Sequence, residues 1–152
     1  MKIAVAKERR PGEARVAVSP DVVRKFKDLG FDVTVEKGAG AGASFTDAAY
    51  TDAGAVLAKD AVAALKGADV VLKVRRPILD GPQSRNELAM MKPGAILIGH
   101  LEAAANKSDV AAYAKAGITA FAMELMPRIS RAQSMDVLAS QKIGSAACRA
   151  TA

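Results

Sequence analysis

Short apolar runs alternate with amphipathic stretches from the start of the chain to about residue 123. The apolar runs predict β-strands at residues 3–6, 69–74, 95–99 and 118–123, and alternation of apolar with polar residues predicts another at 31–36. Helical spacing and capping residues predict helices at residues 20–29, 47–53, 61–65, 86–91 and 108–115. The last run, from Gly117 to Met123, has the apolar content of a buried strand. This alternation predicts an α/β fold, a Rossmann- or flavodoxin-like parallel sheet with helices on both faces.

Ligands of open parallel sheets bind beyond the carboxyl ends of the strands, so the loops at that edge are the candidate sites. In this chain those loops are residues 7–15, 38–44, 75–77 together with His100, and 127–136.

Composition narrows the possible functions. At 152 residues the chain has the size of one domain, and it holds 51% hydrophobic and 4% aromatic residues. The net charge of +6 is spread along the chain among 16 acidic residues, so we expect no nucleic-acid partner. The single Cys148 excludes an internal disulfide and fits a reducing compartment. The sequence contains no apolar run of the roughly 20 residues that a membrane-spanning helix needs, which predicts a soluble chain.

The glycine-rich segment from Gly38 to Gly42 follows a predicted strand and invites comparison with the dinucleotide fingerprint G-x-G-x-x-G. Its third glycine position falls at Ala43, and the residues beyond it resemble a turn before a helix N-cap. No acidic residue ends a strand about 20 positions further on, as that fingerprint requires. We therefore interpret the segment as a glycine turn.

Arg15, Arg75 and His100 form a second candidate pocket. Arg15 follows a charged loop, Arg75 ends one predicted strand, and His100 ends the next. Two arginines and a titratable imidazole at one edge could bind a carboxylate ligand. The alternatives are a solvated loop in which Arg15 pairs with Glu8 or Glu13, and a histidine with a purely structural role. No spacing of His, Cys or acidic residues predicts a metal site.

The segment from residue 127 to residue 136 is the densest in polar groups that can orient a ligand. It holds two arginines, two serines, a glutamine and an aspartate directly after the last predicted strand. A binding loop is one interpretation. A polar connection in which Ser134 caps the next helix is the other, and local chemistry does not separate the two.

Four segments together resemble the NAD(H)-binding α subunit of proton-translocating nicotinamide nucleotide transhydrogenases. They are residues 7–17, 38–44, 72–74 and the specific block Pro-Arg-Ile-Ser-Arg-Ala-Gln-Ser-Met-Asp at 127–136. The similarity runs from residue 1 to about 141. It implies that residues 1–141 form the first of two domains, and that a second Rossmann domain carries the glycine fingerprint for NAD.

The resemblance implies an oxidoreductase that transfers hydride from NADH to NADP+ and couples this to proton translocation. Its implied partners are a membrane-embedded subunit and an NADP(H)-binding subunit, with a homodimer in the full-length form. The implied location is cytoplasmic, held at the inner membrane through those partners. By the resemblance, the positions that bind NAD(H) are Arg128, Ile129, Ser130, Gln133, Ser134, Met135 and Asp136.

Two departures from the family pattern bear on these expectations. Ala139 stands where relatives have serine, and residues 142–152 replace a helix with an Ala-Gly-Tyr-Arg run that leads into the second domain. We therefore expect a shortened chain that is inactive alone. The alternatives are a fragment of an alanine-dehydrogenase-like oxidoreductase, with Arg75 where those enzymes have lysine, and a non-catalytic docking module.

Overall fold

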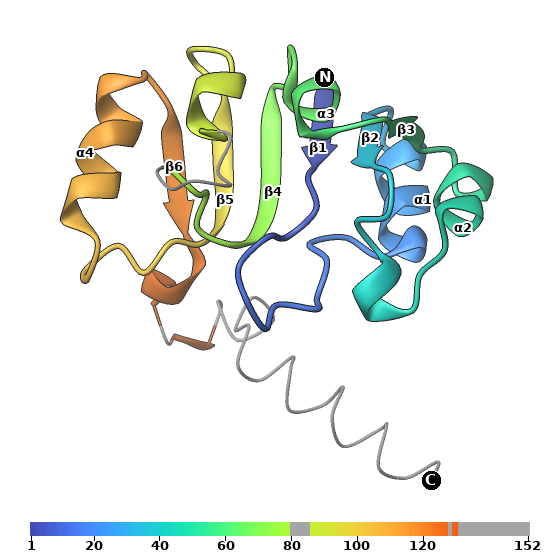
Figure 1. Cartoon of the computed structure of the whole chain (residues 1–152), viewed down its shortest axis with the longest axis horizontal. Helices are drawn as coiled ribbons and strands as arrows, with labels where there is room; N and C mark the ends of the chain where they lie inside the picture. Colours follow the sequence, from blue (N-terminus) through green and yellow to red (C-terminus); the bar gives the residue numbers. More distant parts are fainter. Residues whose placement is uncertain (80–85, 128, 131–152) are drawn as a thin grey trace, which may run out of the picture.

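The computed structural model describes residues 1–79, 86–127 and 129–130, and it contains a six-stranded sheet in the order β3-β2-β1-β4-β5-β6 (Figure 1). The strands are β1 (Lys2–Val5), β2 (Asp32–Glu36), β3 (Val56–Ala58), β4 (Val70–Arg75), β5 (Ile96–His100) and β6 (Thr119–Ala122). Every neighbouring pair is parallel. This strand order is that of the Rossmann fold, so the predicted fold class is confirmed.

Four α-helices and three short 3-10 helices accompany the strands in the described part of the chain. They are α1 (Pro20–Asp28), α2 (Asp47–Asp52), α3 (Ala61–Leu65) and α4 (Lys107–Lys115), with the 3-10 helices η1 (Ala41–Ala43), η2 (Leu88–Met90) and η3 (Met123–Leu125). Helices α1 and α2 lie beside β2 and β3, whereas α4 lies beside β6 at the other end of the sheet (Figure 1).

Two apolar clusters result, and the central strand β1 contributes to both. Val5 joins the cluster that contains Val23 and Tyr50, which come from α1 and α2. Ala4 joins the cluster that contains Leu65, from α3, and Tyr113, from α4. Adjacent residues of β1 are therefore buried on opposite faces, as a central parallel strand requires.

Local sequence explains where α1 begins and ends. The Ser19 hydroxyl accepts a hydrogen bond from the Val22 N–H at 3.4 Å, and Pro20 opens the first turn. After Leu29 the chain turns at Gly30, whose φ of 82° is unfavourable for residues with a β-carbon. These features match the predicted start and end of the helix.

Three predictions about the elements need correction. The strand β3 was not predicted, because its three residues carry no alternating pattern long enough to detect. The predicted helix at 86–91 is only the 3-10 helix η2. The last strand is not buried: β6 is an edge strand, and its Phe121 is 54% exposed. Apolar content alone does not distinguish a central strand from an edge strand.

No helix in the described part of the chain is long and apolar enough to cross a membrane.

Candidate functional site

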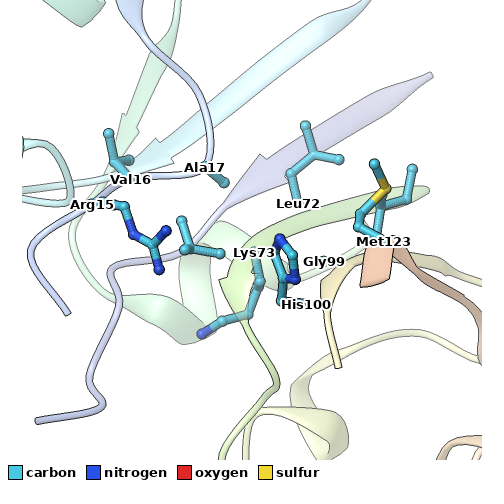
Figure 2. Close-up of a pocket in the computed structure, with 10 residues that line it drawn as sticks. Arg15, Val16, Ala17, Leu72, Lys73, Gly99, His100 and Met123 are labelled. Atoms are coloured by element: carbon cyan, nitrogen blue, oxygen red, sulfur yellow. The ribbon is translucent and has the colours of Figure 1, made fainter. Parts of the chain in front are cut away.

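A cavity of about 280 Å³ opens at the carboxyl ends of β4 and β5 (Figure 2). Its lining residues are Arg15, Val16, Ala17, Leu72, Lys73, Val74, Ile98, Gly99, His100 and Met123. Strands β1 and β4 are neighbours in space but not in sequence order, so the cavity lies beside the switch point of the sheet. Ligands of doubly wound sheets bind at such a point.

Arg15 is paired within its own loop. Its Nε and one terminal nitrogen lie 2.7 and 2.6 Å from the two carboxylate oxygens of Glu13. The Arg15 backbone N–H also donates to Glu13, at 3.0 Å. The hydrogen bond from the Arg15 guanidinium lowers the pKa of the Glu13 carboxyl. Arg15 therefore borders the cavity with its bidentate face already engaged by a carboxylate.

His100 and Arg75 occupy paired positions of β5 and β4 but face different surroundings. His100 lines the cavity, and its Nδ1 lies 3.9 Å from the Glu124 carboxylate. Its Nε2 is buried and has no hydrogen-bond partner among the residues that the structure describes. Arg75 instead bonds the Glu102 carboxylate at 2.8 Å and does not line the cavity. The structure thus brings Arg15 and His100 to one cavity and directs Arg75 elsewhere.

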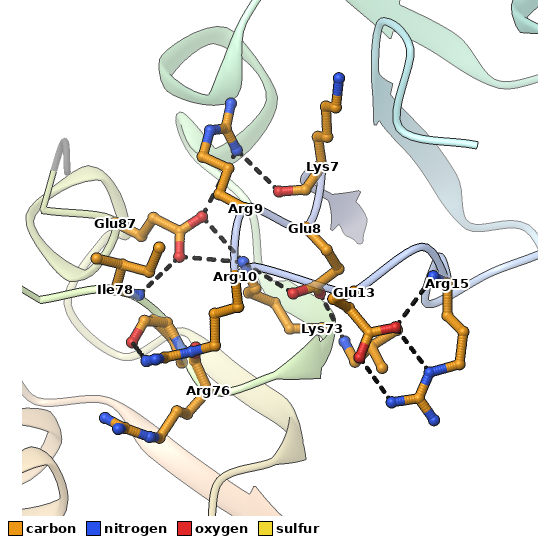
Figure 3. Close-up of polar contacts among 12 residues, drawn as sticks. Lys7, Glu8, Arg9, Arg10, Glu13, Arg15, Lys73, Arg76, Ile78 and Glu87 are labelled. Carbon is orange, nitrogen blue, oxygen red and sulfur yellow. Dashed lines mark hydrogen bonds and ion pairs between the residues drawn. The ribbon is translucent and has the colours of Figure 1, made fainter. Parts of the chain in front are cut away.

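A buried cluster of charged side chains lies next to the cavity, and Lys73 belongs to both (Figure 3). The Lys73 Nζ donates to both carboxylate oxygens of Glu87, at 2.9 and 3.0 Å, and lies 3.7 Å from Glu8. Glu8 accepts the backbone N–H of Val74 at 2.7 Å, and Glu87 accepts that of Ile78 at 2.9 Å. Burial raises the pKa of the Glu8 carboxyl, while the Lys73 ammonium opposes this rise.

The charged loop after β1 is therefore tied to both neighbouring strands. Arg9 pairs with Glu36 at the end of β2, and Glu36 also accepts the Lys7 backbone N–H at 2.8 Å. Arg10 donates to the backbone carbonyls of Arg76 and Pro77 beyond β4, at 3.1 and 3.2 Å. The loop is therefore held in place by hydrogen bonds to both neighbouring strands. The sequence alone did not predict these hydrogen bonds.

The glycine turn after β2 packs against its surroundings. A β-carbon at Gly40 would lie 2.6 Å from the Tyr50 ring, and one at Gly42 would lie 2.7 Å from the Ala14 carbonyl oxygen. The turn leads into the short 3-10 helix η1, so no α-helix starts there. Close packing explains both glycines without a phosphate ligand.

The segment predicted to bind nicotinamide lies mostly outside the described residues. Arg128, Gln133, Ser134, Met135 and Asp136 belong to the stretch that the structure does not describe. Of the predicted positions, Ile129 and Ser130 are described, and both are exposed. The Ile129 N–H donates to the Pro127 carbonyl at 2.9 Å. This segment follows η3 directly, and Met123 of η3 lines the cavity.

The roles of four acidic residues at this edge do not follow from the sequence, namely Glu8, Glu87, Glu102 and Glu124. Glu8 is a candidate partner for Arg15 by sequence, but Arg15 pairs with Glu13. Each of the four bonds groups distant in the chain, such as the Glu8 bond to Val74 across 66 positions. A single sequence has no signal for such pairs, because the residues next to a glutamate in sequence do not show which distant groups its carboxylate bonds in the fold. In the described ranges no group of three or more His, Cys, Asp or Glu side chains could hold a metal ion.

The fold and the cavity define a Rossmann-like α/β domain with a ligand-type crevice at the carboxyl ends of its strands. Comparison with known proteins identifies the family. Residues 4–143 match the family described as alanine dehydrogenase/PNT, N-terminal domain, so the chain belongs to that family.

The similar proteins include transhydrogenase subunits and alanine dehydrogenases. An NAD(P) transhydrogenase alpha subunit of Rhodospirillum rubrum is 60% identical over 141 residues, which are 93% of this chain and 36% of that protein. Alanine dehydrogenase 1 of Staphylococcus aureus is 34% identical over 145 residues, 93% of this chain and 37% of that protein. The chain thus spans little more than a third of the length of either relative.

Solved structures agree with this assignment. The transhydrogenase from Sinorhizobium meliloti superposes with a TM-score of 0.84 at 49% identity, over 93% of this chain and 40% of that one. An L-alanine dehydrogenase superposes with a TM-score of 0.74 at 35% identity, over 82% of this chain and 32% of that one. Both neighbours are oxidoreductases by name, and the greater similarity is to the transhydrogenase.

Proposed function

We propose that this chain supplies one side of the NAD(H) site of a transhydrogenase α subunit, with residues 1–141 as the first of two domains. The 60% identity to the Rhodospirillum rubrum subunit over these residues carries the proposal. The 34% identity to an alanine dehydrogenase is much lower over a similar length.

The residues of the cavity fit a nicotinamide ring. Leu72, Ile98 and Met123 form an apolar wall on which a flat ring can lie. The buried Nε2 of His100, which has no partner among the described residues, suits a polar ring substituent such as a carboxamide. The cavity of about 280 Å³ has room for one ring with its substituent but not for a whole dinucleotide.

The chain's contribution to the reaction is positional. Arg128, Gln133 and Asp136 orient the ring, and Ile129, Ser130, Ser134 and Met135 complete the loop around it. When bound, NADH supplies the hydride that NADP+ on a partner subunit accepts, so no side chain needs to act as acid or base. Fixing the ring at transfer distance lowers the barrier by removing orientational freedom.

The remaining components of the assembly belong to the same proposal. The full-length subunit pairs with a second copy of itself. It lies in the cytoplasm and docks to an NADP(H)-binding subunit and a membrane-embedded subunit that couples hydride transfer to proton translocation.

The proposal is tested with a chimera in which residues 1–141 replace the matching segment of the Rhodospirillum rubrum subunit. We expect the chimera to bind NADH and, with its partner subunits, to reduce an NADP+ analogue. Arg128→Ala and Gln133→Ala should weaken both, whereas Lys25→Ala on the exposed side of α1 should change neither. The isolated 152 residues should bind NADH no tighter than about millimolar, because residues 1–141 supply only one of the two domains in this proposal. Tighter binding by the isolated chain, or no binding by the chimera, would overturn the proposal.

The alternative functions are tested with the same protein. Arg15 is engaged by Glu13 and Arg75 by Glu102, which leaves little of the cationic pocket for a carboxylate substrate. NADH oxidation by the chimera that depends on pyruvate and ammonium would favour the alanine dehydrogenase alternative. NADH binding without any hydride transfer would favour a docking module.

A further inference from the structure

Glu124 connects the start of the 127–136 segment to the end of a neighbouring strand. It lies in η3, shortly before Pro127, and its side chain is 26% exposed. One carboxylate oxygen accepts the Ala103 N–H at 2.9 Å, and the other accepts the Leu101 N–H at 3.1 Å. Both amides belong to the turn that follows β5. The carboxylate therefore joins two chain segments 21 and 23 positions apart.

The backbone of that turn is shaped to hold an anion. Glu102, between the two donors, has a φ of 51°, in the left-handed region that residues with a β-carbon seldom adopt. A left-handed residue between two amides turns both N–H groups toward one side and forms an anion-binding concavity. The Glu124 carboxylate occupies this concavity, which explains how the unfavourable backbone angle is retained.

The side chain and carbonyl of Glu102 hold the same turn from the other side. Its carboxylate bonds Arg75 at 2.8 Å and lies 3.5 Å from the Nε of Arg76. Its carbonyl accepts the backbone N–H groups of Ala105 and Asn106, both at 3.0 Å. The turn after β5 is therefore anchored to the end of β4, and through Glu124 it determines where η3 lies.

We propose that Glu124 is a positioning residue for NAD(H) binding: its carboxylate fixes η3, and with it Met123, at the wall of the cavity. This inference rests on the function proposed above. Met123 lines the cavity one position before Glu124, so a shift of η3 changes the cavity wall.

The state of the Glu124 side chain agrees with this role. Burial by itself would raise the pKa of the Glu124 carboxyl, but the Ala103 and Leu101 N–H groups and the nearby His100 together lower it. Glu124 is therefore a charged acceptor at neutral pH, and hydrogen bonds to a charged acceptor are stronger than those to a neutral one.

The first test measures amide hydrogen exchange in the 152-residue chain itself. Glu124→Ala should remove the protection of the Leu101 and Ala103 amides, and Glu124→Gln should keep protection at one of them, because its amide group has one acceptor oxygen. Asp52→Asn is the control: it removes an exposed carboxylate from α2, which packs beside β3 at the opposite end of the sheet from β6. Unchanged protection in Glu124→Ala would overturn the proposed anchor.

The second test measures NADH binding and turnover in the chimera. Glu124→Ala should raise the Kd and KM for NADH roughly tenfold, with a smaller effect for Glu124→Gln and none for Asp52→Asn. The Tm of each variant separates a local effect from general unfolding, and Glu124→Gln remains informative where Glu124→Ala is unstable. Normal NADH affinity together with lost amide protection would show an anchor without a role in binding, and would overturn the positioning role. Failure of the unsubstituted chimera to bind NADH would overturn the proposed function instead, and the exchange data would still decide the anchor.

Discussion

The Lys73 ammonium lies 2.9 and 3.0 Å from the two carboxylate oxygens of Glu87, and both side chains are buried. A charged pair removed from water is tolerated only when the geometry is good and the remaining polar atoms are bonded. Here Glu8 lies 3.7 Å from the ammonium, and backbone amides bond both carboxylates. Among the described residues the Glu8 Oε2 has no hydrogen-bond partner, so the ammonium is its nearest compensation. The pair fixes β4 against the loop after β1 and the segment before η2, next to the cavity (Figure 3).

Lys73→Met should lower the free energy of unfolding by about 3–5 kcal/mol, because it leaves two carboxylates buried without their cation. Urea unfolding of the 152-residue chain at neutral pH measures this change. The double variant Lys73→Met, Glu87→Gln should recover some of the loss, since one of the unpaired charges is then removed.

The exposed pair between Arg24 and Asp21, at 2.6 Å, provides a matched control. Arg24→Met should cost less than about 1 kcal/mol, because water already screens that pair. A loss below about 1 kcal/mol for Lys73→Met as well would contradict the buried cluster described here.

The Arg15–Glu13 pair should make stability depend on pH in the acid range. Hydrogen bonding to Arg15 lowers the pKa of Glu13 below its ordinary value of 4.5, so the unfolded chain binds a proton at this site more readily than the folded chain. The stabilisation is therefore present above pH 4.5 and is lost as the pH falls through the lowered pKa. Glu13→Gln should give a shallower decline of unfolding free energy between about pH 5 and pH 3.

Arg15→Gln should change the acid dependence in the same way as Glu13→Gln, and the double variant should add little to either. Urea unfolding at several pH values for the four proteins gives the cycle. Some of the decline should remain in all of them, because Glu124 also has a lowered pKa. Additive effects of the two substitutions would mean that the residues do not act as a pair.

The sheet could be predicted from sequence because β1, β4 and β5 are largely apolar runs and β2 alternates valines with polar residues, and both patterns are local signals. The strand β3 and the exposure of β6 could not, since both depend on which elements pack together across the fold. The site divides in the same way. The positions of Arg15 and His100 at one edge follow from strand order. The Glu124 contact with Leu101 and Ala103 depends on the left-handed backbone of Glu102, which its residue type does not predict.

Gly42→Ala should lower the free energy of unfolding by about 1–3 kcal/mol, the usual cost of forcing atoms into a packed contact. The new methyl group would lie 2.7 Å from the Ala14 carbonyl oxygen and push the loop that carries Arg15 away from the glycine turn. Ala41→Ser, one position earlier and exposed, should change the free energy by no more than about 0.5 kcal/mol. Equal effects of the two substitutions in urea unfolding would show that the turn is not packed against the loop.

Phe121 and Leu97 lie on adjacent strands, and their substitution tests whether β6 is an exposed edge. Leu97 is fully buried in β5, so Leu97→Ala should cost about 2–5 kcal/mol through lost burial and the cavity left behind. Phe121 is 54% exposed, so Phe121→Ser should cost far less in the 152-residue chain, on the order of 1 kcal/mol or below. Urea unfolding of both variants decides the point. A loss for Phe121→Ser as large as that for Leu97→Ala would mean that another surface covers β6, and a concentration-dependent Tm would then identify that surface as a second copy of the chain.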